Sequence, residues 1–273
     1  MSDPSNVQNV ETGSDKLLCS VDAGVGVITF NDPGNRNPLG YDLRPVFRRT
    51  IEAVADDESI RCLLLTGAGK AFCAGGNAKA MATMEQPPIE ERIRMIRWES
   101  EVTALIHEMP KPVIAALPGA AAGAGFSIAL AADLRIAAES GFIVAAFAKL
   151  GLPGDFGGSW LLTQLVGPAK AREIYFGSQR LDSAECLALG IFNRVVPDNE
   201  LQSSALAWAR DLAEGPPIAL RWMKANLNRA LVADLRTCIS EEAERQCQAA
   251  ETEDFKEATR AFAEKRKPVF KGR

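Results

Sequence analysis

One aspartate stands between two glycine-bearing turns in the stretch "KLGLPGDFGGSWLL", which runs from Lys149 to Leu162. Asp155 is followed closely by an apolar segment with a helical pattern. An aspartate in this position often caps the free N–H groups at the start of a helix. In an apolar environment, burial would instead raise the pKa of the carboxyl group and suit it to proton transfer. Asp155 is therefore a candidate both for a capping residue and for a catalytic acid/base.

Two other stretches are rich in small residues: "FCAGGN" (Phe72–Asn77) and "GAAAGAGFS" (Gly119–Ser127). Each follows a predicted strand, and loops that open into helices present free N–H groups to negative charge. Small residues also let a ligand approach the backbone closely. Two such N–H groups converging on one carbonyl oxygen would form an oxyanion hole, although tight turns alone could also require these glycines.

Neither stretch fits a nucleotide-binding motif. "GAGKAF" (Gly67–Phe72) contains the Gly-Lys pair of a P-loop, but Leu64 stands where the first glycine is needed and Ala71 where Ser or Thr is needed. The spacing of Gly119–Gly125 matches a short-chain dehydrogenase loop, but it lies in the middle of the chain. Such enzymes also need a Tyr-x-x-x-Lys pair, and neither tyrosine of this chain is followed by a lysine four residues later.

Composition excludes several function classes. The chain has 273 residues, a net charge of −4 and a pI of about 5.3, so nucleic acid is not an expected partner. The six cysteines are dispersed and predict reduced thiols in a cytoplasmic protein, with neither a disulfide framework nor a zinc site. With His107 as the single histidine, a histidine-rich metal site is excluded.

No membrane association is expected. The polar start of the chain lacks the basic and apolar regions of a signal peptide. Val113–Ala132 carries no charge, but it is dominated by Ala and Gly and is interrupted by "LPG". A buried strand, a tight turn and a buried helix explain this segment better than a membrane span.

The remaining pattern predicts how these loops are positioned. Apolar runs typical of buried strands alternate with helical stretches such as Leu39–Asp57 and Ile89–Glu108, which favours an α/β core with parallel strands. We expect a disordered lead-in over residues 1–16, a core over 17–197 and a helical region over 198–273. The predicted strands are Val25–Phe30, Ile60–Gly67, Pro112–Leu117, Leu134–Ala138, Phe142–Ala146 and Phe192–Val196.

Five segments in order resemble the crotonase superfamily, the enoyl-CoA hydratases and isomerases. They include "LLLTGAGKAFCAGGNAKAM" (Leu63–Met81), "MPKPVIAALPGAAAGAGFSIALAADLRIAA" (Met109–Ala138), "KLGLPGDFGGSWLLTQLVGPAKAREI" (Lys149–Ile174) and the C-terminal "FKEATRAFAEKRKPVFKGR" (Phe255–Arg273). The resemblance implies a spiral of β-β-α units and a C-terminal helical region that builds homotrimers or dimers of trimers. It also implies acyl-CoA thioester substrates, a place in fatty acid metabolism, and no cofactor apart from the coenzyme A of the substrate.

The resemblance also implies roles for individual residues. The N–H groups of Gly76 and Ala124 would hold the thioester oxygen and stabilise an enolate. Ala71, Ala74 and Asn77 would line the coenzyme A channel. Further expected substrate contacts come from Arg36, Ser127, Phe147 and Trp160, and from Phe262 and Lys265, which would reach coenzyme A from a neighbouring subunit.

The chain departs from the hydratase pattern at both catalytic glutamates. Alignment with the family places Ser127 at the first glutamate and Phe147 at the second, and neither can transfer a proton as a carboxylate does. Asp155 matches the aspartate of ring-opening and double-bond isomerases of the family. The expected reaction is therefore double-bond isomerisation of an enoyl-CoA with Asp155 as the single acid/base.

Several alternatives stay open. A hydratase is possible if Glu99 or Glu101 enters the pocket, but their spacing beside Arg94 and Arg97 favours solvated helix-face charges. A dehalogenase or a thioester hydrolase could use the same scaffold. A non-catalytic acyl-CoA-binding scaffold protein is the non-enzymatic alternative.

Overall fold

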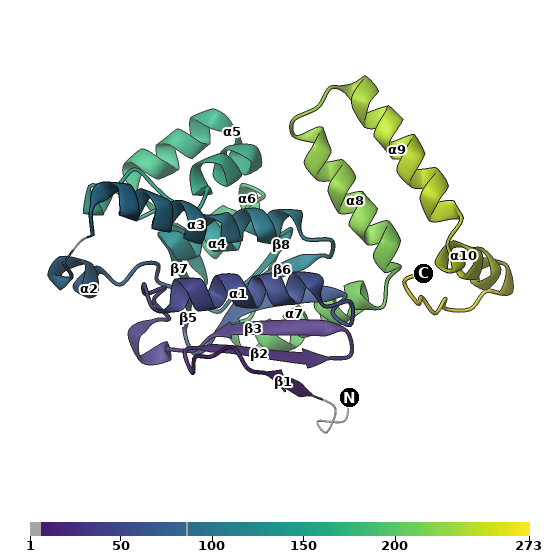
Figure 1. Ribbon diagram of the computed structural model, residues 1–273, viewed down its shortest axis with the longest axis horizontal. Coiled ribbons are helices and arrows are strands. Elements are labelled where there is room, and N and C mark those ends of the chain that lie inside the picture. The colour runs from purple at the N-terminus through teal and green to yellow at the C-terminus, as the bar shows by residue number, and fades with distance from the viewer. Residues whose placement is uncertain (1–6, 86) are drawn as a thin grey trace.

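The computed structural model describes residues 7–85 and 87–273, which form two β-sheets surrounded by helices (Figure 1). The larger sheet has the strand order β1-β2-β3-β4-β6-β8-β11. Its strands from β3 to β11 are parallel, whereas β1, β2 and β3 pair antiparallel. The strands are β1 (Gln8–Val10), β2 (Leu17–Asp22), β3 (Val25–Phe30), β4 (Cys62–Gly67), β6 (Val113–Leu117), β8 (Leu134–Ala138) and β11 (Arg194–Val196).

The smaller sheet receives one strand from each successive unit of the chain. After β4, β6 and β8, the chain crosses to β5 (Ala71–Cys73), β7 (Ala120–Ala122) and β9 (Phe142–Val144), which pair in parallel. β10 (Arg180–Asp182) closes this sheet antiparallel to β9. Each unit therefore gives one strand to each sheet before it enters a helix, and this repetition produces the spiral of β-β-α units that the family resemblance implies.

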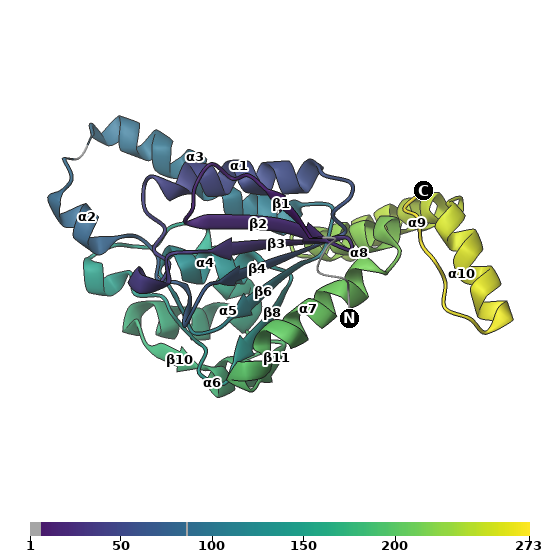
Figure 2. The same ribbon diagram turned by 90° about the horizontal axis from the view of Figure 1, so that it is seen from below.

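Helices cover both faces of the larger sheet. One face packs on α1 (Leu43–Asp56), α3 (Ile89–Glu108), α4 (Ala124–Ala131) and α5 (Gly158–Gly177), and the opposite face packs on α7 (Leu201–Ala213). Figure 2 shows α1 and α3 along one side of the strands and α7 along the other. Within β4, Leu63 and Leu65 join the first core cluster while Cys62 and Leu64 join the second. This two-sided burial explains why β4 is a continuous apolar run.

Three helices form an arm that extends from the core: α8 (Pro217–Ala230), α9 (Leu235–Ala250) and α10 (Glu253–Glu264) (Figures 1 and 2). Lys224 of α8 attaches this arm to the core. Its Nζ donates to the carbonyl oxygens of Ile106 at 3.0 Å and Lys111 at 3.2 Å, and pairs with the Asp133 carboxylate at 2.8 Å. Removing one partner of such a buried pair typically costs about 3–5 kcal/mol, so this contact fixes α8 firmly.

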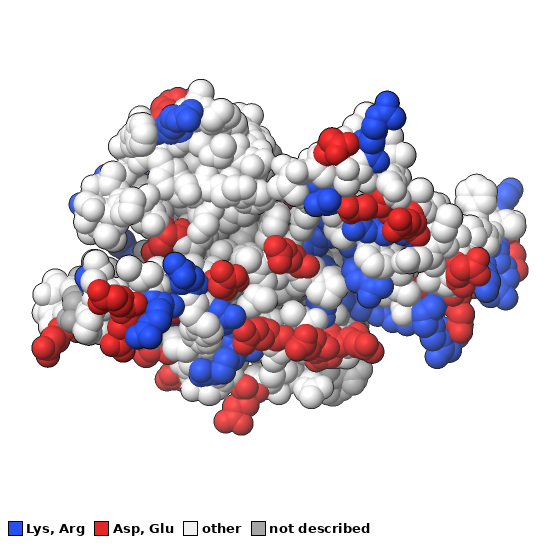
Figure 3. Space-filling model, turned by 45° about the horizontal axis from the view of Figure 1, so that its top comes forward, with Lys and Arg blue, Asp and Glu red and all other residues white. Residues whose placement is uncertain are grey.

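The structure corrects the expectation of a disordered lead-in over residues 1–16. Gln8–Val10 is not disordered but forms an edge strand on β2, while residues 1–6 lie outside the described part of the chain. α7 packs on the core sheet, so only α8–α10 leave the core. Val113–Ala132 forms β6, β7 and α4, as expected, and within residues 7–85 and 87–273 no helix is long and apolar enough to cross a membrane. Acidic and basic side chains are interspersed on the face shown in Figure 3.

Candidate active site

The loops after β5 and β7 lie in direct contact. Gly75 has a positive φ of 80°, and a methyl group on its Cα would lie 2.5 Å from the carbonyl oxygen of Ala122 and 3.2 Å from the nitrogen of Ala124. Only glycine can therefore occupy this position without forcing the loops apart. The close approach places the two predicted oxyanion donors, on Gly76 and Ala124, on adjoining segments.

The N–H groups of Gly76 and Ala124 are both available to a ligand. Ala124 is the first residue of α4, so its N–H has no acceptor within the helix. Among the described residues, neither N–H donates to a backbone hydrogen bond in a loop or turn. The N-terminus of α4 adds its positive dipole end to the same place. Together these groups can stabilise a negative charge that develops on a thioester oxygen.

A cavity of about 380 Å³ lies beside this loop pair. Met81 lines the cavity, and its side chain lies so close to Gly76 that a methyl group on Gly76 would overlap it. The cavity therefore lies next to this predicted oxyanion donor. The titratable groups in its wall are Tyr41, Arg44, Arg92, Glu99 and Asp155. Its apolar lining consists of Met81, Met84, Pro87, Met95, Ile96, Phe147, Leu152 and Pro153.

Asp155 lines this cavity and does not cap a helix. The N-cap of α5 is Gly157, and no side chain caps that helix. The Oδ1 atom of Asp155 is shielded from solvent and has no hydrogen-bond partner. Burial raises the pKa of Asp155 from 3.8 to about 6; the charge of Arg44 lowers this pKa and the charge of Glu99 raises it. A carboxyl group with this pKa can accept and return a proton near neutral pH.

Ser127 holds the backbone of Asp155 in place. The Ser127 hydroxyl is fully buried in α4 and donates to the carbonyl oxygen of Asp155 at 3.0 Å. A methyl group on Gly158 would overlap Ser127 Oγ, so this glycine lets the start of α5 approach α4 closely. Ser127 thus positions the backbone segment that carries Asp155.

Phe147 contributes an apolar wall next to Asp155. It lines the cavity and stacks on Tyr175, with ring centroids 5.9 Å apart. The Tyr175 hydroxyl is buried without a partner, and burial together with the charge of Asp155 raises its pKa far above neutrality. Tyr175 therefore keeps its proton and cannot act as a base near neutral pH.

Glu99 is not a solvated helix-face charge, as its sequence spacing suggests, but a buried residue of the cavity wall. It is 4% exposed and forms an ion pair with Arg44, itself 5% exposed, at 2.9 Å. Glu101 is exposed, as predicted. A sequence signal for the pair exists, because Arg44 and Glu99 each occupy the buried face of an amphipathic helix, in line with Phe47 and Val102 respectively.

Four other predicted site residues lie along or beside the loop after β5 and are not part of the cavity lining: Arg36, Ala71, Ala74 and Asn77. The loop of Arg36 contacts the β5 loop, where the Ala74 N–H donates to the Arg36 carbonyl oxygen at 3.0 Å. Ala71 is buried in β5, and Asn77 caps α2 (Ala78–Thr83) by accepting from the Ala80 N–H. These residues all adjoin the loop that carries Gly76.

Three further predicted substrate contacts, Trp160, Phe262 and Lys265, belong neither to the cavity lining nor to the loop after β5. Trp160 is not among the lining residues and packs on His107, with ring centroids 5.4 Å apart. Phe262 is 87% exposed in α10, and Lys265 ends that helix in a left-handed conformation. Both lie on the arm and not in the lining of the cavity.

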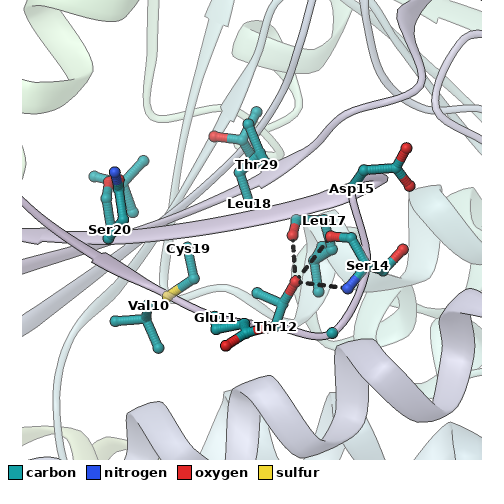
Figure 4. Close-up of a pocket in the computed structure, with 13 residues that line it drawn as sticks. Val10, Glu11, Thr12, Ser14, Asp15, Leu17, Leu18, Cys19, Ser20 and Thr29 are labelled. Atoms are coloured by element: carbon teal, nitrogen blue, oxygen red, sulfur yellow. Dashed lines mark hydrogen bonds between the residues drawn. The ribbon is translucent and has the colours of Figure 1, made fainter.

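A larger hollow of about 880 Å³ lies elsewhere, along β1 and β2 (Figure 4). Its polar groups serve the local turn, since the Thr12 hydroxyl contacts the carbonyl oxygens of Ser14 and Leu17. None of the predicted site residues lines it. Among the described residues, no three metal-ligating side chains gather at one place.

Comparison with known proteins identifies the family. A family model for enoyl-CoA hydratase/isomerase matches residues 20–273. The chain belongs to this family. A 1,2-epoxyphenylacetyl-CoA isomerase of Escherichia coli K12 is 35% identical over 94% of the chain and 98% of its own length. A short-chain-enoyl-CoA hydratase of Clostridium acetobutylicum is 33% identical, with 92% and 95% covered.

Solved structures of the enoyl-CoA hydratase/isomerase family share the fold. The crystal structure of an enoyl-CoA hydratase from Polaromonas sp. JS666 superposes with a TM-score of 0.88 at 31% identity and covers 93% of this chain and 99% of that one. The predicted crotonase fold and family are therefore confirmed. Relatives named as isomerases and as hydratases lie at similar identity, so the family assignment leaves the reaction to be argued from the site.

Replacing Asp155 with asparagine should stabilise the folded protein at neutral pH. The pKa of Asp155 is raised from 3.8 to about 6 on folding, so the protonated carboxyl group is favoured in the folded state and stability falls as the pH rises between these values. Above this range the ionised carboxylate costs about 3 kcal/mol relative to a neutral amide. Urea unfolding should show a higher midpoint for Asp155→Asn at pH 8 and nearly equal midpoints at pH 4. A variant less stable than the wild type at pH 8 would show that the site favours the carboxylate.

Proposed function

We propose that this protein isomerises the double bond of an enoyl-CoA, with Asp155 as the single acid/base. The observation that carries the proposal is the state of the two cavity carboxylates. Asp155 Oδ1 is buried without a partner, whereas Glu99 is neutralised by Arg44. One free carboxylate is enough to move a proton between two carbons, while hydration needs two that flank a water.

The proposed reaction uses the oxyanion donors and Asp155 in sequence. The thioester oxygen accepts hydrogen bonds from the N–H groups of Gly76 and Ala124. The Asp155 carboxylate removes a proton from C2 of a 3-enoyl-CoA, and the electron pair of that C–H bond forms a dienolate whose charge these donors stabilise. Protonated Asp155 then returns the proton to C4, which leaves a 2-enoyl-CoA and regenerates the carboxylate. No cofactor is consumed, because proton and electrons balance within the substrate.

Hydration of a 2-enoyl-CoA is the second candidate, since Glu99 lines the same cavity as Asp155. Its ion pair with Arg44 argues against it, because the guanidinium already occupies a carboxylate oxygen that would have to hold the attacking water. The two reactions differ in whether they tolerate the loss of the Glu99 carboxylate. Hydration requires both carboxylates, whereas isomerisation requires Asp155 alone.

The assignment can be tested with a 3-enoyl-CoA and a 2-enoyl-CoA as substrates. We expect the wild type to convert the former into the latter, and Asp155→Asn to lower kcat/KM by about 10²- to 10⁴-fold, the usual effect of a general acid/base. The control variant Glu101→Gln changes an exposed residue of helix α3 and should leave the rate unchanged. Rapid hydration of the 2-enoyl-CoA without double-bond migration would refute the isomerase proposal.

The pH profile should report the titration of Asp155. Since the carboxylate must be ionised to accept the C2 proton, kcat/KM should rise with pH through about 6 and then level off. The charge of Glu99 raises the pKa of Asp155, so Glu99→Gln should move the rising limb to lower pH. Glu101→Gln is the control and should leave the limb in place. A limb that does not move in Glu99→Gln would mean that another group controls the rate.

We further propose that the protein forms a homotrimer, or a dimer of trimers, through the α8–α10 arm. The arm exposes large apolar side chains, and Leu235 is 75% and Leu227 is 70% exposed. Such a surface is typical of an interface. Light scattering should give a multiple of 29.3 kDa for the wild type and a smaller mass for Leu227→Asp combined with Leu235→Asp. A wild-type monomer at micromolar concentration would contradict this proposal, and with it the roles of Phe262 and Lys265 in coenzyme A binding.

A further inference from the structure

The acyl cavity contains one cation that the protein itself does not neutralise. Arg44 is paired with Glu99, and Asp155 is the proposed acid/base. Arg92 also lines the cavity, but its Nε is shielded from solvent and has no hydrogen-bond partner. Among the described residues, none of the ion pairs includes Arg92. A buried donor without a partner is unfavourable, so an acceptor on the ligand would be bound strongly here.

Arg92 lies at the opposite end of the cavity wall from the proposed chemistry. Arg92, Met95, Ile96 and Glu99 follow helical spacing and form one stripe of α3 along the cavity. Seven residues of helix separate Arg92 from Glu99 by about 10 Å along the axis. The charges that shift the pKa of Asp155 are those of Arg44 and Glu99, and Arg92 is not among them, in keeping with this separation.

The wall between these two ends is apolar. Met95 and Ile96 lie between Arg92 and Glu99 on α3, and Met81 and Leu152 face the same space from other elements. An alkyl chain would bury its carbon atoms against these side chains. A chain whose reacting carbons lie beside Asp155 would reach Arg92 with its far end after about six to eight carbons.

We propose that the preferred substrate is a coenzyme A monothioester of an unsaturated dicarboxylic acid, whose free carboxylate pairs with Arg92. A carboxylate matches the planar fork of a guanidinium and can form two parallel hydrogen bonds with it. The apolar wall holds the alkyl chain in between. This inference rests on the proposed function for the placement of the thioester at Gly76 and Ala124.

The inference is tested by equilibrium binding, which does not depend on turnover. Suberyl-CoA and octanoyl-CoA have the same chain length, and neither has a double bond to migrate. Isothermal titration should show that the wild type binds suberyl-CoA about 10- to 100-fold more tightly than octanoyl-CoA, the usual range for a charge-assisted hydrogen bond. Arg92→Met should lose this preference while its affinity for octanoyl-CoA stays that of the wild type, which also shows that the variant is folded.

Two further variants sharpen the result. Arg94→Met removes an exposed cation from the same helix and should keep the preference for suberyl-CoA. Arg92→Lys keeps the charge but not the fork, so it should retain only part of the preference. Equal affinity of the wild type for both ligands, or equal weakening of both by Arg92→Met, would overturn the inference. A preference for suberyl-CoA without isomerase activity would instead refute the proposed reaction and leave Arg92 as the carboxylate site.

Discussion

The ion pair between Arg44 and Glu99 is the interaction on which the candidate site depends most. It joins α1 to α3 across the cavity and neutralises two charges that could not be buried singly. Arg44 also lies over the rings of Tyr41 and Phe156, so its guanidinium is enclosed on several sides. With these charges neutralised, Asp155 is left as the unpaired carboxyl group of the cavity, and burial raises its pKa. The ion pair thus helps to build the wall of the cavity, while burial raises the pKa of Asp155 beside it.

The second constraint is the close approach of two backbones at Gly75. Because the β5 and β7 loops touch there, the free N–H groups of Gly76 and Ala124 are fixed by the sheet rather than by side chains. The parallel pairing of β5 and β7 brings these loops together although they are far apart in the sequence. The proposed oxyanion stabilisation would accordingly come from the fold, while the reaction would depend on the side chains beside it.

Much of the fold could be predicted from the sequence. The apolar runs of β3, β4 and β6 and the full length of α3 follow directly from hydrophobic periodicity. The three-residue strands β5, β7 and β10 are too short to show any period, and their pairing depends on contacts that are distant in the chain. β1 is an edge strand whose three residues are all exposed, so it shows no alternation of apolar and polar residues. The polar composition of the lead-in therefore predicts disorder where the structure has a strand.

The site was predictable only in part. Asp155 and the glycine loops stand out because their residue types are unusual in their setting. Glu99 lies in line with Val102 on its own helix, but its charged neighbours suggest a solvated face, and its partner Arg44 lies 55 residues away in the chain. Ser127 and Phe147 replace groups expected from the family, and the structure places each beside Asp155: Ser127 holds the backbone of Asp155, and Phe147 forms part of the apolar wall of the cavity.

The most direct test of this account is the structure of the protein with a nonhydrolysable enoyl-CoA bound. We predict that a carboxyl oxygen of Asp155 lies within about 3.5 Å of both C2 and C4 of the acyl chain, the distance of a reactive contact. The carbonyl oxygen should lie about 3 Å from the nitrogens of Gly76 and Ala124. An acyl chain that leaves Asp155 out of contact with C2 and C4, or a carbonyl oxygen bound away from the two loops, would contradict the central claim.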